Sequence, residues 1–358
     1  FIIDEYPDMT LLEPAQTIHS MFRQIVDTLP LNIKLILSGS QLDMMKSLLD
    51  SANPLFGRFH IVIKLEDFNY MEAASCYPQA PVYEKVGFYS VFGGLPFIAR
   101  ELDESKSLKE SILRLLLPQH GKTRMYLENI LLNELRKTAF GWGILSIIGN
   151  RKATYKDIED RLGKNTNGLL ARQLETMENM ELITKVYPIN AYGDKKKSFY
   201  EIKNNLIRFY FTYIYENKGR LEWVDEGLFY DRYIAPSINT FISYRFEEIV
   251  GDYFKLLARK GLRLDIEDVG RYWYNDKGKH QNGEFDCALR TETGYEIYEV
   301  KYFSKAMTEK ECREEQEQVN SIPGLTIRKL GFASVNGFTF SSGQWNLLEG
   351  KDLYNVRN

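Results

Sequence analysis

Short apolar runs and one helical stretch alternate along the first 66 residues. The chain opens with a three-residue apolar run directly before Asp4 and Glu5, and a second run covers residues 33–37. Runs that are apolar on both faces are typical of buried parallel strands, and ligands bind at the carboxyl ends of such strands. With a helix at residues 17–29 and a third strand at residues 61–65, the pattern predicts part of an α/β sheet.

The middle of the chain has apolar positions at helical spacing, followed by two short strand-like runs. Helices are predicted at residues 125–138 and 167–181, and between them a short helix at residues 154–163 is capped by a threonine and closed by a glycine. Strands at residues 182–187 and 198–202 follow, joined by a segment with three consecutive lysines. Two helices joined by a tight turn and followed by a hairpin predict a winged helix-turn-helix.

Residues 206–215 are rich in aromatic side chains and apolar on every side of a helix. Aromatic rings at a surface can stack on nucleic-acid bases. A helix that is apolar all round is more often buried between domains. We therefore expect this helix to pack inside the protein.

Charged side chains interrupt the apolar pattern of the last region on two neighbouring strands. Glu284 and Asp286 share one face of the first strand, and Glu299 and Lys301 share one face of the second, because side chains alternate along a strand. A turn at residues 291–294 makes the strands a hairpin, which places Asp286, Glu299 and Lys301 together. The predicted elements of this region are a helix around residues 246–250, strands at residues 271–274, 283–289 and 295–302, a helix at residues 308–319 and a strand at residues 326–333.

At 358 residues the chain is longer than one ordinary core supports, so several domains are expected. Hydrophobic residues make up 44% and charged residues 27%, which is the balance of a soluble globular protein and excludes a disordered class. Apolar runs are far shorter than the roughly 20 residues of a membrane-spanning helix, so we expect a cytoplasmic protein with no membrane partner. The predicted domain boundaries are residues 1–66, 67–118, 119–218 and 219–358.

Charge is distributed unevenly over these domains. Residues 119–218 hold 17 Lys and Arg against 11 Asp and Glu, whereas residues 1–118 hold 10 against 15 and residues 219–358 hold 19 against 23. Phosphate groups are neutralised by clustered basic side chains. Any contact with DNA is therefore expected in the middle of the chain. The three cysteines lack the paired spacing of a zinc site or a disulfide framework.

The order of three short motifs, Asp-Glu, Ser-Gly-Ser and Pro-Leu-Phe-Gly-Arg, resembles the archaeal-type ATPase family in the STAND branch of AAA+ P-loop NTPases. By this resemblance the first strand is a Walker B strand, Asp4 holds Mg²⁺ and Glu5 orients or activates the attacking water. Ser38 or Ser40 would sense the γ-phosphate. Arg58 would contact ATP or couple its state to a helical lid at residues 67–118. The alternative is that Arg58 caps a helix or pairs with an acid.

The family's phosphate-binding loop has no counterpart in this sequence. Gly-x-x-x-x-Gly-Lys-Ser/Thr is absent, and the sequence starts in a strand without a start methionine. Without that loop the phosphates have neither a backbone cradle nor a lysine. We therefore expect a chain truncated just before its Walker B strand, which does not hydrolyse ATP alone. ATP and Mg²⁺ would be cofactors of the parent protein only, unless the gene product is a remnant.

A winged helix implies specific contacts with DNA. Its second helix enters the major groove and its hairpin touches the phosphate backbone. The alternative is that the lysines keep an exposed turn soluble and that the winged helix binds proteins or is autoinhibitory. The predicted nucleic-acid contacts are Asn165, Asn167, Arg172, Lys195, Lys196 and Lys197.

The C-terminal hairpin resembles the PD-(D/E)XK nuclease core, which has a restriction-endonuclease-like α/β fold. By this resemblance Asp286 and Glu299 bind Mg²⁺ or Mn²⁺, Lys301 positions water or stabilises developing charge, and Glu247 is an additional acid on the preceding helix. Gln316 and Gln318 fall where such cores often carry a supporting polar residue. The proline that usually precedes the first acid is replaced by Phe285.

Together these patterns predict a multidomain α/β protein: part of a P-loop ATPase sheet, a helical lid, a winged helix-turn-helix and a nuclease-like domain. The expected function is that of a DNA-associated ATPase fragment, whose C-terminal domain binds or cleaves nucleic acid with the help of a metal. The alternative is a signalling or scaffold protein that uses the winged helix and the nuclease-like fold for contacts with other proteins or with itself. In that case the carboxylates would have no catalytic role.

Overall fold

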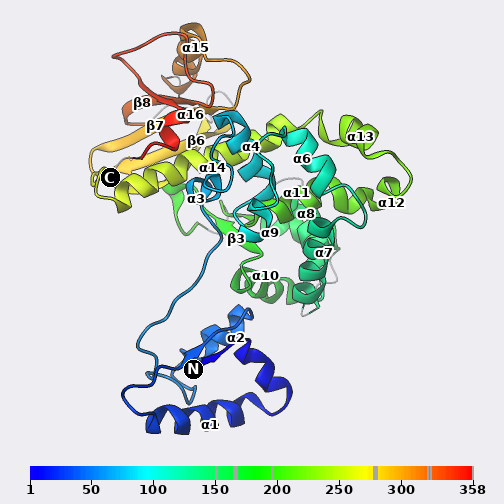
Figure 1. Cartoon of the computed structure of the whole chain (residues 1–358). Helices are drawn as coiled ribbons and strands as arrows, with labels where there is room; N and C mark the ends of the chain where they lie inside the picture. The colour runs from blue at the N-terminus through cyan, green and yellow to red at the C-terminus, as the bar shows by residue number, and fades with distance from the viewer. Residues whose placement is uncertain are drawn as a thin grey trace. The chain divides into compact units, whose positions relative to one another are not determined.

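The computed structural model describes residues 1–136, 138–149, 152–163, 168–194, 197–276, 281–320, 322 and 325–356. They form two compact units (Figure 1). The first consists of Phe1–Glu66 with Leu174–Leu182, and the second of Asp67–Gln173 with Ile183–Asn358. The protein is of the mixed α/β class, because helices accompany a five-stranded sheet that contains both parallel and antiparallel pairs.

In the first unit, strands β1 (Ile2–Ile3) and β2 (Ile36–Leu37) pair in parallel. The 3₁₀ helix η1 (Tyr6–Leu11), helix α1 (Ala15–Thr28) and helix α2 (Leu42–Ser47) accompany them. Burial of apolar side chains is the main force that holds so small a unit together. The buried side chains of this core are Tyr6, Ile18, Phe22, Leu48 and Leu55.

The strand predicted at residues 61–65 is not formed. Ile61 is 77% exposed and Leu65 is 90% exposed, and the described residues provide no strand that pairs with this segment. A strand needs a neighbour to satisfy its backbone hydrogen-bonding groups. The apolar pattern of the segment was therefore insufficient to make it a strand here.

Helices make up most of the first half of the second unit. Thr154 caps α9: its side chain accepts a hydrogen bond from the Asp157 N–H, and its own N–H donates to the Asp157 carboxylate, 2.9 Å away. Gly163 then ends the helix with a φ of 87°, which glycine adopts without strain. The helices before the hairpin are α3 (Tyr70–Ala74), α4 (Val82–Phe92), α5 (Pro96–Ala99), α6 (Leu108–Leu115), α7 (Lys122–Leu135), α8 (Gly141–Gly149), α9 (Tyr155–Leu162) and α10 (Leu169–Asn179), and α10 belongs to the first unit from Leu174 onward.

The hairpin predicted after α10 is present. Strands β3 (Ile183–Val186) and β4 (Phe199–Ile202) pair antiparallel, with Ile183 opposite Ile202. An isolated bridge between Ala153 and Tyr200 adds a third segment on the other side of β4. A short 3₁₀ helix, η3 (Ile189–Ala191), follows β3.

The aromatic helix is buried, as predicted. It consists of α11 (Asn205–Phe209), which continues as the π-helix η4 (Tyr210–Ile214). Phe209, Tyr210 and Phe211 are fully buried. Their burial leaves these rings covered by protein, so packing is their role. The remaining helical elements up to the sheet are η5 (Tyr215–Asn217), α12 (Lys218–Leu221), α13 (Glu226–Phe229), η6 (Tyr230–Ile234) and α14 (Ile238–Arg259).

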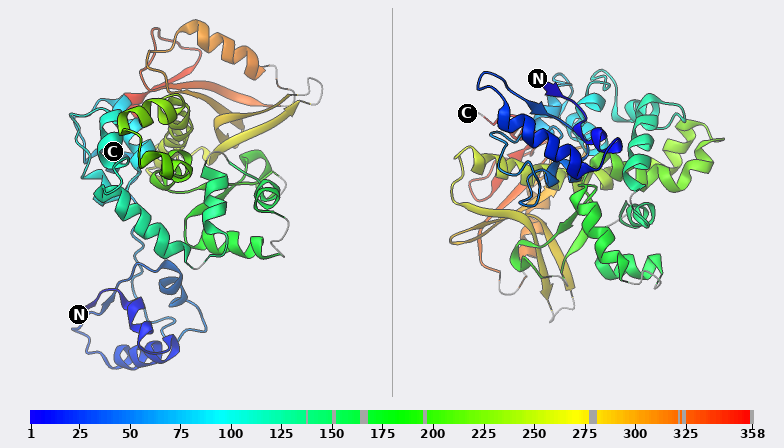
Figure 2. Two further views of the ribbon diagram at one scale, coloured as in Figure 1. Left: turned by 90° about the vertical axis from the view of Figure 1, so that its right-hand side faces the viewer. Right: turned by 90° about the horizontal axis from the view of Figure 1, so that it is seen from below.

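The C-terminal sheet has the strand order β5-β6-β7-β8-β9. Its first three strands pair antiparallel and its last three pair parallel. Helix α14 packs on β5, β6 and β7, whereas α15 covers the opposite face (Figures 1 and 2). The bounds are β5 (Ile266–Asp276), β6 (Gln281–Thr291), β7 (Gly294–Lys301), α15 (Glu309–Asn320), β8 (Ile327–Ser334), β9 (Asn346–Glu349) and α16 (Gly350–Leu353).

Residues 67–118 lie in the same unit as this sheet. The Tyr70 hydroxyl donates a hydrogen bond to the Leu353 carbonyl (2.9 Å), and the rings of Tyr83 and Tyr302 stack with their centroids 4.4 Å apart. Helix α4 packs against α14. The predicted helical lid is thus held to the C-terminal region, residues 219–358, by contacts of its tyrosines and by the packing of α4 on α14.

Candidate functional site

The first unit brings the two N-terminal acids next to the two predicted serines. The Ser38 hydroxyl lies 2.6 Å from Asp4 Oδ1, and the Ser40 hydroxyl lies 2.9 Å from Glu5 Oε2. The parallel pairing of β1 and β2 explains this arrangement, because it places the carboxyl ends of both strands at the same edge. Glu5 has a left-handed backbone (φ 48°), which is uncommon for a residue other than glycine.

Arg58 lies in a different contact of the first unit. Its guanidinium makes two hydrogen bonds to Asp27, with distances of 2.7 and 3.0 Å, and also donates to the Pro54 carbonyl. Arg58 is thus paired with an acid, which is one of the alternatives considered for it. No contact of Arg58 with Asp4 or Glu5 is present among the described residues.

In the C-terminal region, the pairing of β6 and β7 brings together Asp286, Glu299 and Lys301. The last described pair of this ladder is Cys287 with Tyr298, so the next residues are Asp286 and Glu299. On its other side β6 pairs with β5 and contains a bulge, in which Asp286 and Cys287 together lie opposite the single residue Arg271. A bulge re-aims a side chain relative to regular alternation. The Asp286 carboxylate accepts a hydrogen bond from the Val300 N–H at 3.3 Å.

Both carboxylates of this hairpin have pKa values above their ordinary values. Burial, together with the charge of Asp286, raises the pKa of Glu299 to about 7 against the opposing charge of Lys301. Burial also raises the pKa of Asp286, again against the charge of Lys301. Burial by itself would lower the pKa of Lys301, but the neighbouring carboxylates of Glu299 and Glu315 outweigh burial and raise this pKa. A cation bound between the acids would relieve their repulsion.

Lys301 has two carboxylate neighbours. Its Nζ atom lies 3.4 Å from Glu299 Oε2 and 2.9 Å from Glu315 Oε1. Glu315 is on α15, beside the predicted Gln316, and the sequence pattern did not single it out. The helix was recognised from its sequence, but the residue that faces Lys301 depends on how α15 lies over the sheet.

Glu247 is buried on α14 beside the same hairpin. It is 7% exposed, its Oε2 atom has no hydrogen-bond partner among the described residues, and Arg271 Nη2 lies 3.6 Å from that atom. Burial, together with the charge of Asp286, raises the pKa of Glu247 well above its usual range. An orphaned buried carboxylate oxygen is a group that a cation can satisfy.

The donor chemistry at this site fits a hard divalent cation. Carboxylate oxygens suit Mg²⁺ and Mn²⁺, and Asp286, Glu299 and Glu247 supply them. Within the described part of the chain, however, no three acidic, histidine or cysteine side chains converge in the arrangement of a metal centre. Glu247 Oε2 instead lies 3.6 Å from Arg271 Nη2. The acids are therefore neighbours, without forming a closed set of ligands.

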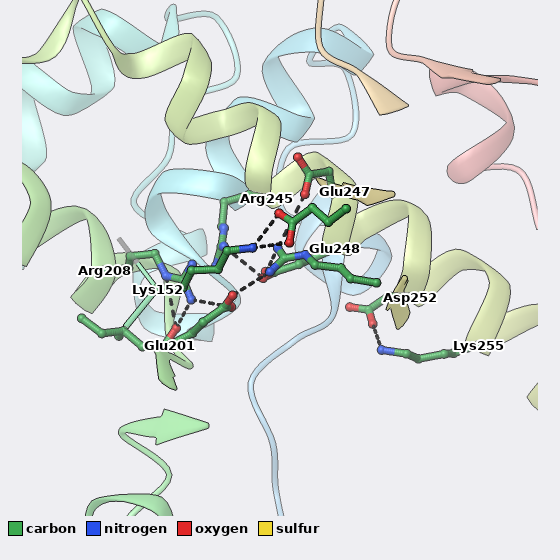
Figure 3. A network of polar contacts seen from close by, with 11 residues as sticks. Lys152, Glu201, Arg208, Arg245, Glu247, Glu248, Asp252 and Lys255 are labelled. Atoms are coloured by element: carbon green, nitrogen blue, oxygen red, sulfur yellow. Dashed lines mark hydrogen bonds and ion pairs between the residues drawn. The ribbon is translucent and has the colours of Figure 1, made fainter. Parts of the chain in front are cut away.

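A buried ion network joins Arg245 and Glu248 on α14 to Glu201 and Arg208 in the central region, residues 119–218 (Figure 3). Glu201 on β4 accepts hydrogen bonds from Arg271 Nη1 (2.7 Å) and from Arg208 (3.2 Å). Burial opposes the ionisation of Glu201, but the charges of Arg208, Arg271 and Arg245 outweigh it and lower its pKa far below the usual range. Arg245 pairs with Glu248 at 3.0 Å. Nothing in the sequence pattern linked Glu201 to the C-terminal hairpin.

The hairpin of the central region is docked on the edge strand β5. The Asn190 side chain donates to the Trp273 carbonyl (2.7 Å) and accepts from the Trp273 N–H (3.2 Å). The ring of Phe199 stacks on Trp273, with centroids 5.2 Å apart. This docking covers part of an edge whose backbone groups would otherwise be open.

Of the predicted nucleic-acid contacts, the structure describes two. Arg172 is exposed on α10, and Lys197 is exposed just before β4. Asn165, Asn167, Lys195 and Lys196 lie outside the described residues. None of the helices that the structure describes has the length and apolar character needed to cross a membrane.

Comparison with known proteins finds a family model that resembles part of the C-terminal region. Residues 210–314 match the model of the family described as "Archaea bacterial proteins of unknown function". The matched segment includes Glu247, Asp286, Glu299 and Lys301.

Two further proteins are similar to this chain. An uncharacterized protein of Methanocaldococcus jannaschii is 27% identical over 285 residues, which cover 76% of this chain and 61% of that protein. This chain thus corresponds to about three fifths of that relative's length. The crystal structure of a Vibrio cholerae protein matches with a TM-score of 0.27 and 10% identity, covering 84% of this chain and 63% of the other.

Proposed function

We propose that the C-terminal region is a divalent-cation-dependent nuclease and that the central region, a winged helix, binds its DNA substrate. The observation that carries this proposal is the meeting of Asp286, Glu299 and Lys301 on neighbouring strands, with the buried carboxylate of Glu247 beside them. Buried acids with raised pKa values beside a cationic lysine are typical of a site that handles a charged substrate.

Each residue has a distinct role in the proposed reaction. Mg²⁺ or Mn²⁺ bound here would polarise the phosphate and lower the pKa of a water. Asp286 and Glu299 would hold that cation. Lys301, 3.4 Å from Glu299, would hold a positive charge where the phosphate oxygens become more negative. Hydrolysis joins the water oxygen to phosphorus and releases one ester oxygen, which takes up a proton.

The charge of the central region supports binding of DNA there. Its excess of basic side chains, 17 Lys and Arg against 11 Asp and Glu, contrasts with the acidic excess of the C-terminal region. The exposed side chains of Arg172 and Lys197 lie on the helix and hairpin that a winged helix would use. Lys197 would contact phosphates without reading sequence, whereas Arg172 would reach base edges or phosphates.

The nuclease proposal is tested by incubating the purified chain with end-labelled single- and double-stranded DNA and Mg²⁺ or Mn²⁺. Cleavage should require the metal and should be lost in Asp286→Asn and Lys301→Met. Glu292→Gln, on the exposed turn between the strands, is the matched control and should cleave like the wild type. Metal-independent cleavage, or no cleavage by the wild type, would contradict the proposal and favour the scaffold alternative.

Binding of DNA is tested separately by fluorescence anisotropy at several salt concentrations. Replacement of Lys195, Lys196 and Lys197 by Ala should weaken binding and flatten its salt dependence by roughly one unit of slope for each phosphate that is no longer neutralised. Unchanged binding by this triple variant would remove the DNA role assigned to the hairpin.

A second function, nucleotide binding by the first unit, rests on the acid–serine pairs at the ends of β1 and β2. Asp4 with Ser38 and Glu5 with Ser40 are the groups that a Walker B strand and its neighbour would present to Mg²⁺ and the γ-phosphate of ATP. Because the sequence holds no phosphate-loop lysine, the chain by itself should release no phosphate from ATP. A longer form containing such a loop should release phosphate, and Glu5→Gln should abolish this.

A further inference from the structure

The Arg271 guanidinium lies near the carboxylates of Glu201 and Glu247, at different distances from the two. Its Nη1 atom lies 2.7 Å from Glu201 on β4, whereas its Nη2 atom lies 3.6 Å from Glu247 Oε2. The guanidinium is thus bonded to the acid of the central region and only close to the acid of the candidate site. Glu247 Oε2 receives no hydrogen bond from the described residues.

We propose that Glu201 and Arg271 are positioning residues for the metal site. Glu201 holds Arg271 away from Glu247, and this keeps the Glu247 carboxylate available to a divalent cation. The inference rests on the proposed function, because it takes Glu247 as a ligand of that cation. It adds that a residue of the central region controls the affinity of the C-terminal site.

Besides Glu201, two acids lie within ion-pair distance of Arg271, Glu247 and Glu248. A shift of roughly 0.7 Å would bring Nη2 within hydrogen-bond distance of Glu247 Oε2, where a charge-assisted bond would form. Glu248, 3.8 Å from Nη2, is already paired with Arg245 at 3.0 Å. When Glu201 loses its charge, Glu247 is therefore the nearer of the two acids and the one that is not paired with Arg245.

Arg271 and a bound cation then compete for the same oxygen. Both are positively charged and both bind the ionised carboxylate best, so binding of one to this oxygen excludes binding of the other. Partners one contact removed from a metal ligand typically change metal affinity by about 10- to 100-fold when they are altered. Arg271 is such a partner of Glu247, and Glu201, 5% exposed and with Arg271 as its nearest cation, acts on the site through Arg271.

The test measures Mn²⁺ affinity of the full chain from the electron paramagnetic resonance signal of free Mn²⁺, without nucleic acid. Glu201→Gln should bind Mn²⁺ about tenfold more weakly than the wild type. Arg271→Met should bind at least as tightly as the wild type, and the double variant Glu201→Gln/Arg271→Met should regain wild-type affinity. A purely structural role of Glu201 would not be rescued by removing Arg271.

Glu128→Gln is the matched control. Glu128 is also an acid of the central region in an ion network, 3.1 Å from Arg124 and 3.2 Å from Lys218, and no contact joins it to Arg271 among the described residues. This variant should bind Mn²⁺ like the wild type. Glu247→Gln, in contrast, should lower the affinity at least as much as Glu201→Gln.

The outcomes separate this inference from the proposed function. Wild-type affinity in Glu201→Gln, or a double variant as weak as Glu201→Gln, would overturn the positioning role while Asp286→Asn still tests the site itself. If Glu201→Gln fails to fold, as judged by circular dichroism, Arg271→Met decides alone: a tenfold loss of affinity overturns the inference. A wild type that binds no Mn²⁺, or binds it equally well in Asp286→Asn, refutes both proposals.

Discussion

The Lys152 ammonium group of the central region is paired with the Glu284 carboxylate on β6, two residues before Asp286. It also lies 4.7 Å from the ring of Phe199 and 5.5 Å from that of Trp273. The negative charge of Glu284 and the faces of two aromatic rings thus hold Lys152 at the place where the hairpin docks on the sheet. The central region is joined to the candidate site through charge as well as through packing.

This pair should contribute measurably to stability. Its side chains are 35% and 26% exposed, so water screens them only in part. A double-mutant cycle with Lys152→Met and Glu284→Gln should give a coupling of about 1 kcal/mol in the free energy of unfolding by urea. The more exposed pair Lys310–Glu314, 85% and 64% exposed, should give about 0.3 kcal/mol. Equal couplings for the two pairs would contradict the role assigned to Lys152.

Glu201 should make stability depend on pH. Its pKa in the folded protein lies below the ordinary value of 4.5, so its contribution to stability is complete above pH 4.5 and is lost as the pH falls below that value. Glu201→Gln removes the negative charge that Arg208 and Arg271 share and should cost about 3 kcal/mol near pH 7. The difference between variant and wild type should shrink in urea titrations below pH 4.5. A difference that stays constant down to acid pH would show that the charge of Glu201 is unimportant.

Gly294 should fix the turn that sets the β6–β7 register. Its φ is 134°, and a Cβ atom there would lie 3.1 Å from the Thr326 carbonyl oxygen. Gly294→Ala should therefore lower the free energy of unfolding by about 1–3 kcal/mol. Gly343→Ala, where no atom lies within 4 Å of the added carbon, should have a small effect. A neutral Gly294→Ala would show that the turn adapts freely.

Binding of a cation should stabilise the folded chain. At a Mn²⁺ concentration one hundred times the Kd, the free energy of unfolding should rise by about 2.7 kcal/mol, because the folded state binds the ion and the unfolded state does not. Thermal unfolding with and without Mn²⁺ measures this increase. It should vanish in Asp286→Asn and persist in Glu292→Gln, and its persistence in Asp286→Asn would place the bound ion elsewhere.

Local patterns predicted the elements better than they predicted which elements pair. The cap at Thr154 and the stop at Gly163 were recognised from residue type, because capping involves neighbours only three residues apart. The segment at residues 61–65 has an equally apolar pattern and forms no strand. A strand depends on a partner from elsewhere in the chain, and sequence periodicity carries no information about that partner.

The same distinction between local pattern and tertiary contact applies to the candidate site. The sequence by itself determined the carboxylates and the lysine of the β6–β7 hairpin, because alternation along two strands joined by a tight turn fixes which residues meet. It likewise determined that Asp4 and Glu5 end a strand beside Ser38 and Ser40. Only the tertiary structure decided that Arg58 pairs with Asp27 and that Glu315 reaches Lys301.

The link from Glu201 through Arg271 to Glu247 also exists only in the folded chain. The three residues come from separate strands and a helix, and no local period relates them. Burial makes their charges interact strongly, but burial is a property of the packed elements and not of any single segment. The sequence therefore determined which chemical groups are available, and the docking of the hairpin on β5 decided which of them act on one another.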